Sequence, residues 1–68
     1  MNFDFETILS DVLAIAAKAI PIVSEVSPVI TLAKDAIAAY EAKDEAALAT
    51  AQTNAQALAN SLPPPAAP

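Results

Sequence analysis

Carboxylates are the main side chains in this sequence that could serve as acids, bases or metal ligands. Eight Asp and Glu residues stand against three Lys, and the chain contains no His and no Cys. Without His, the commonest general base and metal ligand is missing. Without Cys, there can be neither a disulfide bond nor a thiolate metal site. Enzymatic or metal-binding chemistry would therefore have to come from clustered carboxylates.

The spacing of these carboxylates is typical of helix starts and exposed helix faces. Two pairs stand where helices are expected to begin: Asp4 with Glu6, and Asp44 with Glu45. Acids at such positions cap free amide groups and complement the helix dipole, which explains them without a catalytic role. Other charged residues share one polar column: Asp11, Lys18 and Glu25. A chain this short cannot build a cleft that perturbs such groups. We predict no enzymatic activity, no catalytic or metal-binding residue and no cofactor.

The elements that carry these residues are predicted by a seven-residue repeat between residues 8 and 40. Three columns of the repeat are entirely apolar: Ile8, Ile15, Ile22, Val29, Ala36; Leu9, Ala16, Val23, Ile30, Ile37; and Val12, Ala19, Val26, Ala33, Tyr40. A strict heptad predicts a helix that buries one long stripe against other helices. We expect the large side chains of this heptad stripe to form the packing interface: Ile8, Leu9, Val12, Ile15, Ile22, Val23, Val26, Val29, Ile30, Ile37 and Tyr40.

Two prolines, Pro21 and Pro28, interrupt the repeat and also lie seven residues apart. Proline inside a helix costs roughly 3 kcal/mol and kinks it, and the residue before proline is biased away from helical geometry. Two interpretations follow. Either residues 4–43 form one helix bent twice with the apolar stripe inside, or the chain breaks at Ile20 or Ser27. The predicted class is all-α, with two or three amphipathic helices and a proline-kinked first segment.

The predicted organisation is a single helical domain over residues 1–62, with helices at about 4–20, 21–43 and 44–62. The third helix is a weaker amphipathic segment that is rich in Ala. Residues 63–68 contain four prolines, which favour an extended polyproline tail. Such a tail could lie as a strap along a neighbouring subunit or bind an aromatic-lined groove.

Size and charge limit the partners that can be expected. The net charge is −5, so the chain can neutralise few phosphates, and nucleic-acid binding is improbable. Chains of this length are marginally stable alone and usually need disulfides, a metal or oligomerisation. We therefore predict a homo-oligomer, or docking onto a larger assembly. A signal peptide is not expected, because Asp4 and Glu6 occupy the place of a basic n-region.

A membrane role is the alternative interpretation. Residues 12–33 contain only two charged side chains, Lys18 and Glu25, over a length that could cross a bilayer. Two charges inside the span, two prolines and the lack of an aromatic belt argue against insertion. A small membrane-spanning or membrane-associated protein is thus the less favoured function.

One long segment is rich in Ala and other small or aliphatic residues. It covers residues 13–52 and reads LAIAAKAIPIVSEVSPVITLAKDAIAAYEAKDEAALATAQ. With its short acidic start and polar, Ala-rich final helix, the chain resembles small helical proteins encoded in tailed-phage genomes near the virion and lysis genes. The resemblance implies a minor structural or accessory role in a phage particle, with other virion proteins as partners. It also implies a location in the virion or the host cytoplasm, and it assigns no functional residue.

Overall fold

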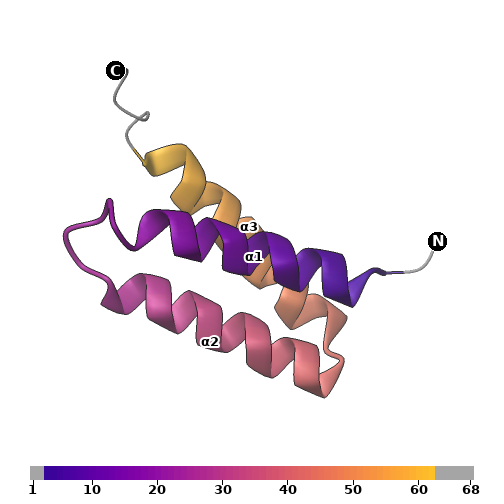
Figure 1. Cartoon of the computed structure of the whole chain (residues 1–68). Coiled ribbons are helices and arrows are strands. Elements are labelled where there is room, and N and C mark those ends of the chain that lie inside the picture. The colour runs from indigo at the N-terminus through magenta and orange to yellow at the C-terminus, as the bar shows by residue number, and fades with distance from the viewer. Residues whose placement is uncertain (1–2, 63–68) are drawn as a thin grey trace.

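Residues 3–62 of the computed structural model fold into three helices: α1 (Phe5–Ala19), α2 (Ser27–Ala42) and α3 (Glu45–Ser61). The predicted all-α class is confirmed, and these residues include no strand. Figure 1 shows α1 and α2 as an antiparallel hairpin, with α3 crossing behind α1. Each helix contacts the other two. The predicted tail, residues 63–68, lies outside the described residues.

The first proline ends α1 instead of kinking it. Asp4 caps the start of α1, and the helix stops at Ala19. Pro21 has no amide hydrogen to continue the helical ladder. The amides of Ile22 and Val23 both donate to the carbonyl of Ala19, at 2.9 Å each, and so close the helix with a turn. The chain therefore breaks after Ile20, and the interpretation as one bent helix is wrong.

The second proline begins α2. Pro28 lies in the first turn of that helix, where a missing amide hydrogen loses no helical bond. The helix predicted over residues 21–43 therefore starts at Ser27, because residues 21–26 belong to the connection between α1 and α2. This break also divides the apolar segment at residues 12–33. None of the helices in the described part of the chain is long and apolar enough to span a membrane.

Two residues connect α2 to α3. Lys43 adopts a left-handed conformation with φ of 56°. Its amide donates to Tyr40 at 3.1 Å, and the amide of Asp44 donates to Ala39 at 3.0 Å, the pairing of a Schellman motif. The carboxylate of Asp44 then accepts from the amide of Ala47 at 3.1 Å. The corner at Lys43 and Asp44 thus provides hydrogen-bond partners for the last carbonyl groups of α2 and for an amide group in the first turn of α3.

Small residues make most of the core. Six of its nine buried residues are Ala, and the nine are Val12, Ala16, Ala19, Val29, Ala36, Ala39, Leu48, Ala51 and Ala55. The large fully buried side chains are Leu48, Val12 and Val29, one from each helix. Alanine allows helices to approach closely but buries little apolar area. The helices are therefore held by close contact more than by large buried side chains.

Candidate interaction surface

The two helix-start carboxylates act as caps. Asp4 accepts hydrogen bonds from the hydroxyl of Thr7 at 2.7 Å and from its amide at 3.1 Å. The hydroxyl bond is the larger cause that holds the pKa of Asp4 below its ordinary value of 3.8, and the amide bond adds to it. Asp44 accepts from Ala47 in the same way. Both carboxylates therefore already serve the ends of helices.

The Asp4 cap gives a pH prediction. Thr7→Val removes the hydroxyl donor, so the pKa of Asp4 should rise towards 3.8. Because the folded-state pKa is lowered, the cap stabilises the fold above the unfolded pKa, and this contribution is lost as the pH falls through the folded pKa. NMR titration of the side-chain carboxyl from about pH 2 to pH 6 checks the shift. Thr50→Val, on an exposed part of α3, should leave it unchanged, and an unchanged Asp4 in Thr7→Val would contradict the assignment.

The remaining acids do not gather into a site. Asp11 and Lys18 line a shallow depression where α1 meets Gln56 of α3. Glu25 is exposed in the connection between α1 and α2. Residues 3–62 contain no cluster of three or more potential metal ligands. Their buried residues are all apolar. The described residues thus place no reactive group in a protected environment.

All three aromatic residues of the chain lie around one lysine. The rings of Phe3 and Phe5 meet edge to face with centroids 4.7 Å apart. The ammonium of Lys43 lies 4.6 Å from the centre of the Tyr40 ring and 5.4 Å from that of Phe5. These are cation–π distances. The contact ties the start of α1 to the corner between α2 and α3, which gives the cluster a structural role.

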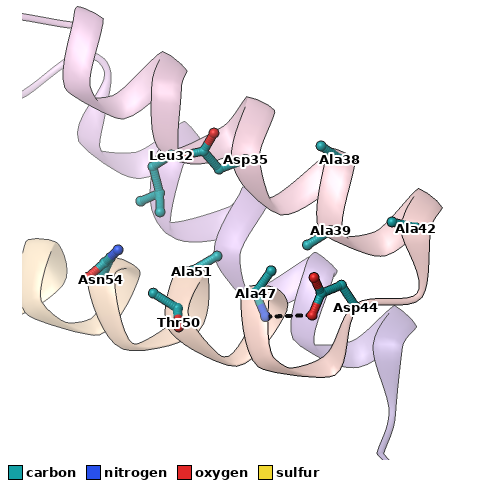
Figure 2. Close-up of a pocket in the computed structure, with 10 residues that line it drawn as sticks. All are labelled: Leu32, Asp35, Ala38, Ala39, Ala42, Asp44, Ala47, Thr50, Ala51 and Asn54. Carbon is teal, nitrogen blue, oxygen red and sulfur yellow. Dashed lines mark hydrogen bonds between the residues drawn. The ribbon is translucent and has the colours of Figure 1, made fainter.

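A shallow groove lies between α2 and α3, and alanine makes up half of the residues that line it (Figure 2). Its walls are Leu32, Asp35, Ala38, Ala39, Ala42, Asp44, Ala47, Thr50, Ala51 and Asn54. The dashed bond in Figure 2 is the cap from Ala47 to Asp44, which lies at one end of the groove. On α2, Leu32 and Ala39 face α3 and pack with its buried residues, whereas the groove residues Asp35, Ala38 and Ala42 are exposed at its rim.

The residues of the heptad stripe separate into three groups in the structure. Two are buried inside the chain itself: Val12 and Val29. Five are half-buried: Ile8, Leu9, Ile15, Val23 and Tyr40. Four remain exposed: Ile22, Val26, Ile30 and Ile37. Val12 and Val29 therefore pack against helices of the same chain, and the role of the stripe as an interface with other molecules stays a prediction.

The exposed members belong to a surface that we call the apolar face: Ile20, Ile22, Val26, Ile30 and Ile37. These five side chains each keep between 39% and 46% of their surface exposed. Ile20 was not among the predicted stripe residues. The sequence could have indicated Ile20 through its spacing, because it follows Leu13, a half-buried residue of α1, by seven residues. This spacing places both residues on one side of that helix.

The apolar face lies on the side of the α1–α2 hairpin away from α3. On α2, Ile30 and Ile37 are about 140–160° around the helix from Asp35, which lines the groove on the α3 side. On α1, Ile20 is about 160° from Lys18, which lies beside Gln56 of α3. The helix that covers one side of the hairpin thus leaves the other side open at the end of α1 and along α2.

Fold and surface together define a small three-helix protein with an uncovered apolar face. Comparisons of this chain with protein families, with curated proteins and with solved structures find no match.

Proposed function

We propose that this chain is a non-enzymatic structural subunit, which self-associates or docks through its apolar face within a larger assembly. The observation that carries the proposal is the set of five large aliphatic side chains left about two-fifths exposed, of which Ile20, Ile30 and Ile37 lie on the side of the hairpin away from α3. Scattered exposed apolar residues are ordinary, but a contiguous group of this kind marks an interaction surface.

The energy available at this face suits a subunit held by several contacts. Full burial of a branched aliphatic side chain contributes about 1.5–3 kcal/mol, so covering the exposed part of five contributes roughly 3–6 kcal/mol. Association itself costs about 4–15 kcal/mol. The apolar face can therefore anchor an interface, and further contacts around its rim complete it.

A phage particle is the setting that we propose for this assembly, on the resemblance of residues 13–52 to small phage-encoded helical proteins. The test is fractionation of the native source. The chain should sediment with assembled particles, and Ile22→Asp should lose this association, since it places an unpaired charge in the contact. Thr31→Asp, which adds the same charge at an exposed position of α2 outside the apolar face, should retain it. Recovery of the chain in detergent-soluble membrane would contradict the proposal.

A further inference from the structure

The apolar face holds more large aliphatic side chains than the core fully buries. Leu48, Val12 and Val29 are the large residues that are fully buried, whereas five Ile and Val residues remain on the face. Small chains compensate for a weak core by adding disulfides, metals or a second subunit. This chain has no Cys, and residues 3–62 offer no metal cluster. A second subunit is the remaining means of burying the face.

The charges that border the apolar face limit the kinds of partner surface that can bind it. The chain as a whole carries a net charge of −5, yet the α2 part of the face is bordered by one Lys and one Glu, Lys34 and Glu41. On α1, Asp11 and Lys18 lie on the opposite side, towards α3. Glu25, in the connection between α1 and α2, is an exposed acid next to Val26 of the apolar face. A basic partner would find little opposite charge at this surface, so the face suits another apolar and nearly neutral surface.

On α2, the apolar face alternates large and small side chains, which allows two identical helices to pack against each other. Ile30 and Ile37 are two helical turns apart, and between them stand the small Ala33, which packs partly against the core, and the exposed Lys34. Large side chains of one helix can therefore enter the gap over Ala33 on an identical helix, as ridges fit grooves. A symmetric dimer requires such a self-complementary patch.

From these observations we propose that the occupant of the apolar face is a second copy of this chain, which forms a closed dimer through Ile30 and Ile37. The inference rests on the proposed docking role of the face and names its partner. Because each copy is acidic, their mutual repulsion is screened by salt. The dimer should therefore become tighter as the salt concentration rises, which is the opposite of what a basic partner would show.

Sedimentation of the purified full chain over a wide concentration range tests the dimer. The wild type should pass from monomer to dimer. Ile30→Asp and Ile37→Asp should each weaken dimerisation at least about tenfold, while circular dichroism shows unchanged helix content because both positions are exposed. Thr31→Asp adds the same charge to an exposed polar position of α2 and should stay within about twofold of the wild type.

A mixing experiment shows whether two such faces meet. Ile30→Lys alone should be monomeric, like Ile30→Asp. An equimolar mixture of the two variants should recover dimers, since opposite charges then share one interface. A wild-type monomer at every concentration, or a mixture that stays monomeric, would overturn the inference. Either result leaves the docking role open to the particle test with Ile22→Asp, so the two failures are distinguishable.

Discussion

Leu48→Ala is expected to lower the free energy of unfolding by about 2–5 kcal/mol. Leu48 is fully buried in α3 and belongs to the cluster with Val12, Ala36 and Ala39. The fully buried neighbours from α1 and α2 in this cluster are Val and Ala, whose short side chains cannot extend to fill the cavity. A chain of this length has roughly 3–10 kcal/mol of stability, so the variant should lose a large fraction of it.

Urea denaturation followed by circular dichroism, at one fixed protein concentration, measures this loss. Leu58→Ala is the matched control on the same helix. Leu58 is half-buried and packs against the second cluster, which contains Ala16, Ala19 and Val29. Its loss should destabilise the fold by clearly less than the loss of Leu48. Equal effects would show that Leu48 is not central to the core.

Ala55→Leu is expected to destabilise the fold by about 1–3 kcal/mol or more, although it adds apolar volume. Ala55 is fully buried where α3 packs against the other helices. Three additional carbon atoms there would force the helices apart, because the close approach depends on small side chains. The effect should appear as a lower unfolding midpoint in urea with little change in helix content.

Ala57→Leu provides the comparison for this overpacking. Ala57 lies two residues further along α3 and is exposed, so the same substitution there should change stability by less than about 0.5 kcal/mol. A stabilising effect of Ala55→Leu would mean that the helices leave room at this position, contrary to its complete burial.

The helical class and the buried side of α1 could be predicted from the sequence, because the seven-residue repeat keeps its alignment within one helix. Val12 and Ala19 stand in one apolar column, and both are buried. The Asp4 and Asp44 caps could also be predicted, since capping depends on a few neighbouring residues. Local rules therefore describe each helix well.

The side of α2 that is buried could not be predicted in this way. Every apolar column between residues 8 and 40 was compatible with a core, and a choice among them requires the rotation of α2 relative to α1. Because the chain breaks after Ile20, the seven-residue repeat in α1 no longer determines how α2 is rotated about its own axis. The structure buries Val29, Ala36 and Ala39, each one residue before Ile30, Ile37 and Tyr40. One residue corresponds to about 100° of rotation, which exchanges the core and the exposed side.

The corner at Lys43 and Asp44 has a consequence for the order in which the molecule folds. Its hydrogen bonds all join residues between Ala39 and Ala47, so bringing α2 and α3 together requires the closure of a very short loop. Short loops close at the smallest entropic cost and in the shortest time. Docking of α1 must instead close the longer connection through Pro21, whose hydrogen bonds from Ile22 and Val23 to Ala19 close the end of α1 but do not join it to α2. We expect α2 and α3 to form the folding nucleus. The first helix to be synthesised, α1, would then be the last to pack against the others.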